Sequence, residues 1–153
     1  KGQSFKYGDK KKVISDKKEF LELLLLADEQ ESMIDRYLER GDMFVLYDNG
    51  LKACCVVTRE GKEFMKQEHS YDLFFQRQDY GKRLIQFLFD HYRGKCSELL
   101  VGTGDVPSTL SFYEHCGFTI SHRLKNFFTD NYDHPMYEDG KQLVDMVYLK
   151  KTF

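Results

Sequence analysis

A polar loop that leads into a helix is the first segment of this chain with residues suited to binding chemistry. The loop runs from Gln76 to Gly81, and apolar side chains then recur up to Tyr92 at the spacing of an amphipathic helix. A strand that ends at Tyr71 is predicted just before the loop. Free backbone N–H groups and the helix dipole favour an anion at such a helix start. The sequence therefore predicts a phosphate-bearing ligand at the N-terminus of the helix Tyr80–Tyr92, with an ordinary strand-to-helix turn as the alternative.

The four cysteines are the other groups with potential reactivity. Cys54 and Cys55 are adjacent in a predicted strand and point to opposite faces, while Cys96 and Cys116 stand singly in apolar surroundings. No pair has the short spacing of a metal site, and local spacing places no histidine beside a cysteine. We therefore expect free, mostly buried thiols in a reducing cytoplasm, and no bound metal.

Length and composition limit the class of protein. The chain has 153 residues, with 41% hydrophobic residues, 31% charged residues and a net charge of −2, which predicts one globular domain over residues 1–153. No apolar run approaches the roughly 18 residues of a membrane span, and no signal peptide is visible. The charge gives no indication of a nucleic-acid surface. We expect a cytoplasmic protein, monomer or homodimer, without nucleic acid or membrane as a partner.

Before the polar loop, the chain is expected to form one strand, two helices and three further strands. Asp16 is expected to cap the first helix, with Glu19 as its capping-box partner, and Gly41 to end the second. The apolar faces of the two helices are Phe20, Leu23, Leu24 and Ala27, then Met33, Ile34, Tyr37 and Leu38. The strands are expected at Lys11–Ser15, Met43–Tyr47, Leu51–Thr58 and Glu63–Tyr71, with a tight turn at Asp48-Asn49-Gly50.

After the helix Tyr80–Tyr92, the pattern predicts a strand, a helix and two closing strands. A helix between two strands indicates a parallel crossover. The helix opened by Pro107 is expected to end at Gly117 and to turn Leu110, Phe112, Tyr113 and Cys116 inward. The strands are expected at Glu98–Thr103, Phe118–Leu124 and Leu143–Leu149. Residues 125–140 are expected to form a long aromatic and acidic loop, a kind of loop that often serves function.

The order of these elements and two motifs resemble the GNAT-type N-acetyltransferases over nearly the whole chain. Gln76-Arg77-Gln78-Asp79-Tyr80-Gly81 is similar to the family's acetyl-CoA pyrophosphate loop, (Arg/Gln)-x-x-Gly-x-(Gly/Ala). Ser111-Phe112-Tyr113-Glu114-His115-Cys116-Gly117-Phe118 is similar to its Phe-Tyr-x-x-x-Gly-Phe helix. Each motif alone is weak, but the two together, separated by one helix and one strand, are specific. The resemblance implies an α/β (α+β) fold with a mixed, mostly antiparallel sheet of six or seven strands and about four helices.

The resemblance also implies a reaction, in which an acetyl group passes from acetyl-CoA to a primary amine of a small molecule or a protein by direct attack. Tyr113 would act as general acid on the departing thiolate, or else be a core aromatic. The strand through Ser70 and Tyr71 would separate from its neighbour and bind the pantetheine arm like an added strand, with Ser108 as a further contact. The pyrophosphate would lie on backbone N–H groups of Gln76, Arg77, Gln78, Asp79, Tyr80, Gly81 and Lys82.

The general base is the first departure from the family pattern. The amine must lose a proton before it attacks, because it is protonated at neutral pH. Where the family often has a glutamate, this chain has Met65. Glu68 is the nearest substitute, with Glu63 and His69 as other candidates, although each alone also suits an exposed strand.

The second departure is Asp79, which replaces the first glycine of the loop. A carboxylate about 6 Å from a phosphate charge costs roughly 3 kcal/mol at an effective dielectric constant near 20. Arg77, Lys82 and Arg83 could offset part of this cost. The alternative hypothesis is therefore a catalytically degenerate family member that binds acyl-CoA or a protein partner without turnover.

Overall fold

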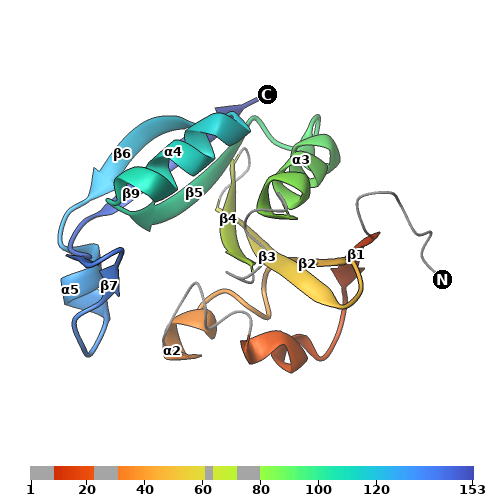
Figure 1. Cartoon of the computed structure of the whole chain (residues 1–153). Helices are drawn as coiled ribbons and strands as arrows, with labels where there is room; N and C mark the ends of the chain where they lie inside the picture. Colours follow the sequence, from red (N-terminus) through yellow and green to blue (C-terminus); the bar gives the residue numbers. More distant parts are fainter. Residues whose placement is uncertain (1–8, 23–30, 61–63, 72–79) are drawn as a thin grey trace.

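The computed structural model describes residues 9–22, 31–60, 64–71 and 80–153, with the backbone alone for 9–11 and 64–71. Within these ranges a seven-stranded sheet has the order β1-β2-β3-β4-β5-β9-β6 (Figure 1). Its strands are β1 Asp9–Val13, β2 Asp42–Tyr47, β3 Leu51–Arg59, β4 Phe64–Tyr71, β5 Glu98–Gly104, β6 Thr119–Leu124 and β9 Met146–Thr152. All neighbours pair antiparallel except β4 and β5, which are parallel. The predicted mixed, mostly antiparallel sheet is confirmed.

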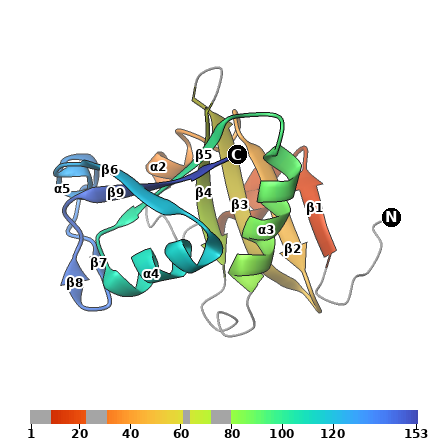
Figure 2. The ribbon, with the colours of Figure 1, turned by 90° about the horizontal axis from the view of Figure 1, so that it is seen from above.

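Two helices, α3 (Tyr80–Tyr92) and α4 (Pro107–Cys116), cover one face of the sheet (Figure 2). The 3-10 helix η1 (Lys17–Phe20) and α2 (Glu31–Ile34) lie on the other face beside the N-terminal strands. On that face of the C-terminal strands lie α5 (Phe127–Asn131) and a hairpin of β7 (Tyr137–Glu138) and β8 (Lys141–Gln142). The bounds of α3 and the parallel crossover from β4 to β5 are as predicted, because both follow from a strong amphipathic pattern.

The central strand β3 is buried on both faces, and its side chains alternate between two cores. Ala53, Cys55 and Val57 pack toward α3, whereas Cys54 and Val56 pack toward α2. Burial raises the pKa of Cys54 to about 12, and burial also raises the pKa of Cys55 well above its usual value. All four cysteines are free, and only Cys96 is partly exposed. The prediction of free, mostly buried thiols is confirmed.

The predicted capping box at Asp16 is wrong. Asp16 has a left-handed backbone (φ 54°) and makes no side-chain cap hydrogen bond. The N–H of Glu19 donates instead to the backbone carbonyl of Asp16, at 3.0 Å, which begins the tighter 3-10 turn of η1. Leu23, Leu24 and Ala27, on the predicted apolar face, lie outside the described residues.

The predicted second helix is shorter than expected, because α2 ends at Ile34 and turns continue from there to Gly41, where packing requires the glycine. A methyl group on Gly41 would stand 2.5 Å from Cγ1 of Val56 and 3.0 Å from the carbonyl oxygen of Tyr37, and its φ is not in the left-handed region. The close approach lets the segment lie directly on β3. The predicted apolar face, Met33, Ile34, Tyr37 and Leu38, is buried throughout.

Residues 125–140 are not the unstructured loop that the sequence predicted. They contain α5 and β7, and β8 follows directly. These elements have two to five residues each, too few for periodicity to reveal. The last strand begins at Met146 rather than Leu143, because the N–H of Leu143 donates to the carbonyl oxygen of Met136, at 2.8 Å, and so closes the β7–β8 hairpin. On α4, Tyr113 and Cys116 are buried as predicted, whereas Leu110 and Phe112 are only partly buried.

A buried ammonium group joins η1 to the segment after α2. Lys17 is 7% exposed, and its Nζ donates to the carbonyl oxygens of Leu38 (2.9 Å), Glu39 (3.3 Å) and Gly41 (2.6 Å). These carbonyl groups lie in the turns after α2, outside any helix, and the lysine supplies them with a donor. The segment that contains η1 is thereby fixed to the turns that lead into β2.

Replacing Lys17 by Met is expected to lower the free energy of unfolding by about 2 kcal/mol, because buried carbonyl groups lose their donor. The matched control is Lys18→Met. Lys18 is exposed and bonded to Glu31 and Asp35, contacts that water screens, so this variant is expected to change stability little. Urea unfolding followed by circular dichroism measures both variants, and equal losses would contradict the role of Lys17.

Candidate functional site

β4 and β5 separate partway along their length. They pair in parallel only over Phe64–Gln67 and Glu98–Val101. Beyond these pairs β4 continues along β3 to Tyr71, and β5 continues along β9 to Gly104. The facing edges past the last pair are therefore not bonded to each other, and they offer main-chain N–H and C=O groups to an extended ligand. The predicted separation of the strand around Ser70 is confirmed.

The helix α3 begins shortly after β4 and presents its first turn without an acidic side chain. Tyr80 and Gly81 are buried at its start, and Lys82 is exposed. The first N–H groups of a helix have no intrahelical acceptor and carry a partial positive charge. This start suits an anionic group, as predicted. The preceding loop residues Gln76, Arg77, Gln78 and Asp79 lie outside the described residues.

Two hydrogen bonds from tyrosines to carboxylates hold α3 on β2. At the start of the helix, Oη of Tyr80 donates to Oδ2 of Asp48 at 2.7 Å. At its end, Oη of Tyr92 donates to Oδ2 of Asp42 at 2.9 Å. The 13-residue helix spans about 18 Å from first to last Cα, and the extended chain from Asp42 to Asp48 spans about 20 Å. Both bonds therefore form together and fix the position of the helix start.

The environment keeps both phenols protonated. The hydrogen bond to Asp48 raises the pKa of Tyr80, and burial followed by the bond to Asp42 raises the pKa of Tyr92. Asp48 itself stands in the tight turn between β2 and β3, where Asn49 and Gly50 have φ of 55° and 109°, as the sequence predicted. A rigid turn thus positions the acceptor of the first bond.

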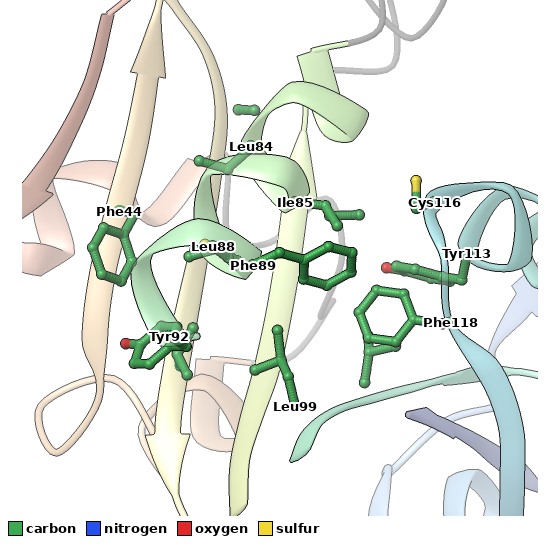
Figure 3. Packing of buried hydrophobic residues seen from close by; sticks show 14 of the residues in the cluster. Phe44, Leu84, Ile85, Leu88, Phe89, Tyr92, Leu99, Tyr113, Cys116 and Phe118 are labelled. Carbon is green, nitrogen blue, oxygen red and sulfur yellow. The ribbon is translucent and has the colours of Figure 1, made fainter. Parts of the chain in front are cut away.

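Tyr113 lies on α4 with its ring in the core that α3 and α4 share. Its side chain is 6% exposed, and its ring meets Phe118 edge-on, with centroids 5.7 Å apart. Figure 3 shows its hydroxyl end directed away from α4, toward α3 and Phe89. Gly117 ends α4 with φ 112°, a left-handed conformation that suits glycine, and turns the chain back so that Phe118 supports Tyr113. The ring packs in this core, while the hydroxyl at its end points toward the neighbouring helix.

Ser108 stands in the first turn of α4 and is bonded to the hairpin. Its hydroxyl donates to Oδ2 of Asp139 at 2.6 Å, and Oγ1 of Thr109 donates to Oε2 of Glu138. The two carboxylates lie at a helix start, where negative charge is stabilising. Sequence reasoning missed these bonds because the partners are 31 and 29 positions apart. Two acidic groups of the segment 125–140 therefore bind α4.

The face opposite α3 and α4 is divided. Among the residues that the structure describes, one apolar cluster there includes Ile34 and Val56 beside α2, and a second includes Phe128 and Tyr148 beside α5. On the α3 and α4 face, by contrast, one cluster extends from β2 to β9. Along the sheet, the point where β4 and β5 separate lies between these two clusters.

The described residues contain no group of three or more His, Cys, Asp or Glu side chains that could hold a metal ion. None of the helices in these ranges is both long enough and apolar enough to cross a membrane.

Comparison with known proteins identifies the family. No family model matches the chain. The chain is similar to a GNAT family acetyltransferase from Elizabethkingia anophelis, solved with acetyl-CoA bound, with 29% identity, a TM-score of 0.90 and coverage of 97% of this chain and 100% of that chain. It is 30% identical over 135 residues to the N-acetyltransferase YvbK of Bacillus subtilis (strain 168), covering 86% of this chain and 87% of that protein. The chain belongs to the GNAT family of N-acetyltransferases.

A further relative of this GNAT protein is a Bacillus subtilis acetyltransferase solved in complex with CoA, with 27% identity, a TM-score of 0.86 and coverage of 94% of this chain and 97% of that chain. The protein is an acetyl-CoA-dependent acetyltransferase. The described structure fits acetyl-CoA, since unpaired strand edges suit an amide-containing arm and the start of α3 suits a phosphate.

In the GNAT protein, Tyr80→Phe is expected to weaken acetyl-CoA binding about three- to tenfold, because the helix start loses its link to Asp48. Tyr92→Phe removes the equivalent bond at the far end of α3 and is the matched control. Each variant is expected to lose about 1 kcal/mol of stability, but only Tyr80→Phe to raise the dissociation constant, measured by calorimetry. Since the Tyr80 pKa is raised, the effect should persist at every pH below about 10 and fade above the raised value. Equal affinities for both variants would show that the bond to Asp48 does not position the site.

Proposed function

We propose that this enzyme transfers the acetyl group of acetyl-CoA to a primary amine of a small molecule or a protein, by direct attack, within one domain over residues 1–153. The observation that supports it most is the opening between β4 and β5. The start of α3 and the hydroxyl of Tyr113 lie on one side of the sheet, and the divided face lies on the other. A thioester in the opening is then accessible to two reactants from two sides.

The co-substrate is held mainly by backbone groups in this proposal. The pantetheine arm adds to the free edge of β4 at Ser70 and Tyr71, in the manner of an extra strand. Ser108 contacts it from the first turn of α4, exchanging or sharing its bond with Asp139. The pyrophosphate accepts hydrogen bonds from N–H groups of the loop and helix start, residues Gln76, Arg77, Gln78, Asp79, Tyr80, Gly81 and Lys82.

Two side chains transfer protons during the reaction: Tyr113 donates one and Glu68 accepts one. The lone pair of the neutral amine forms the new C–N bond to the thioester carbonyl, and the C–S bond breaks with its electron pair on sulfur. Tyr113 donates its phenolic proton to that sulfur as general acid. The amine gives up one proton to Glu68, which is the first β4 residue past the last pair with β5. Proton exchange with solvent restores both side chains.

Replacing Tyr113 by Phe is expected to lower kcat by about a hundredfold or more, because the leaving sulfur loses its proton donor, while leaving the acetyl-CoA dissociation constant within about twofold. Tyr137→Phe, at an exposed tyrosine of β7, is the control and should keep the full rate. Thiol release from acetyl-CoA with phenethylamine and with spermidine measures turnover. A Tyr113→Phe enzyme with the original kcat would remove the tyrosine from the mechanism.

Asp79→Gly is expected to tighten acetyl-CoA binding, by up to about a hundredfold if none of the calculated repulsion is screened. Calorimetry at two salt concentrations measures the change, which should shrink at high salt. An unchanged affinity would argue against the loop as the pyrophosphate site. Binding of acetyl-CoA without thiol release across a panel of amines would support the degenerate, non-catalytic alternative instead.

A further inference from the structure

A tyrosine on β9 extends over β5 at the point where β4 and β5 separate. Tyr148 is the cross-strand partner of Gly102, and Gly102 directly follows Val101, the last β5 residue paired with β4. A methyl group on Gly102 would stand 3.0 Å from Cε1 and 3.1 Å from Cζ of Tyr148. The outer end of the ring, which carries the hydroxyl, therefore occupies the space of a missing β5 side chain.

The neighbours of Tyr148 hold its ring in this orientation. On the β6 side, His122 stacks on it with centroids 4.9 Å apart and planes 12° from parallel. Sδ of Met146 would come within 2.6 Å of the same methyl group on Gly102. Gly102 has no left-handed backbone, so the glycine is required by the space that these two side chains take.

Tyr148 and Tyr113 lie on opposite faces of the sheet. Tyr113 belongs to the cluster beneath α3 and α4, and Tyr148 to the cluster beside α5, on the divided face. Both are nearly buried, at 6% and 5% exposed, so a ligand touches only a small part of either side chain. If acetyl-CoA binds on the α3 and α4 side, the acceptor must approach from the side of Tyr148.

We propose that Tyr148 contacts the acceptor, its hydroxyl oxygen accepting a hydrogen bond from the attacking amine and its ring covering the carbon beside that amine. This role of Tyr148 rests on the proposed function, acetyl transfer to a primary amine. Continued in register, the β4 residue level with Gly102 is Glu68, so the phenol and the proposed base come to the same level of the opening. The side chains at this level are the phenol of Tyr148 and the thioether of Met146, and the imidazole of His122 stacks behind the phenol on the β6 side. They favour an amine on an aromatic or apolar body over a polycation.

Steady-state kinetics with phenethylamine and spermidine test this directly. Tyr148→Phe is expected to raise the KM for phenethylamine about tenfold, the loss of one hydrogen bond, and to leave the acetyl-CoA dissociation constant within about twofold. Gly102→Ala is expected to raise the same KM by displacing the ring, with folding checked by circular dichroism. Tyr137→Phe is the matched control and should change neither constant. The unaltered enzyme is expected to prefer phenethylamine to spermidine in kcat/KM.

Fluorine NMR of the enzyme labelled with 3-fluorotyrosine and saturated with CoA gives a readout that does not need turnover. The resonance of Tyr148 is identified by its loss in Tyr148→Phe. Phenethylamine is expected to shift it and to leave that of Tyr137 in place. A shift without turnover would support the contact and count against the proposed function. Turnover with an unchanged KM for phenethylamine in Tyr148→Phe, together with no shift of the Tyr148 resonance, would overturn the contact. Turnover and a resonance shift with spermidine alone would overturn the preference for an amine on an aromatic or apolar body.

Discussion

The structure depends on the point where two parallel strands stop sharing hydrogen bonds. β4 and β5 pair through four residues each and then follow different neighbours, β3 and β9. Each strand stays bonded on its outer side, so the separation leaves the sheet intact while freeing two inner edges. Backbone amides are strong hydrogen-bonding groups and need partners wherever water is excluded. An arm with alternating amide groups can supply those partners, which is why the opening suits the co-substrate of this family.

The opening between β4 and β5 can hold a ligand in a defined position only if the elements around it are fixed. The helix α3 is held at both ends by phenol–carboxylate bonds, to Asp42 at the start of β2 and to Asp48 in the turn after it, while its apolar face packs on β3. The helix α4 is held at its start by the carboxylates of the β7–β8 hairpin and at its end by the turn at Gly117. Helix starts and the Tyr113 hydroxyl are thereby positioned by contacts outside the opening, which leaves the opening itself to ligands.

The sequence predicts most of the elements, because their patterns are local. The amphipathic repeat gives the bounds of α3, the intervening helix gives the parallel crossover, and the adjacent cysteines of β3 give its two-sided burial. Lys17 could not be predicted, since its three carbonyl partners are fixed only by tertiary packing. The elements between β6 and β9 are too short to give a periodic signal. The capping motif at Asp16 predicted an α-helix, but the chain forms a 3-10 turn there without the side-chain cap.

For the site too, local patterns could be predicted from the sequence and contacts between distant residues could not. Two motifs indicate the family, the co-substrate and the position of Tyr113 on its helix. The hydrogen-bond partners of Tyr80 and Ser108 are 32 and 31 positions away in the sequence, so no local spacing indicates them. Nothing in the sequence singles out Tyr148 either, because its environment arises from a glycine on another strand and from the sheet register that sets them opposite each other.

The pairing of Gly102 with Tyr148 also limits how these two positions can change as related sequences diverge. One volume between β5 and β9 is filled either by a side chain from position 102 or by the ring from position 148, and the two exclude each other. A lineage that acquires a larger residue at 102 must reduce the one at 148, so the two positions are expected to covary. Exchanging the contents of this volume offers a way to reshape the proposed acceptor side without disturbing the strands or the helices α3 and α4.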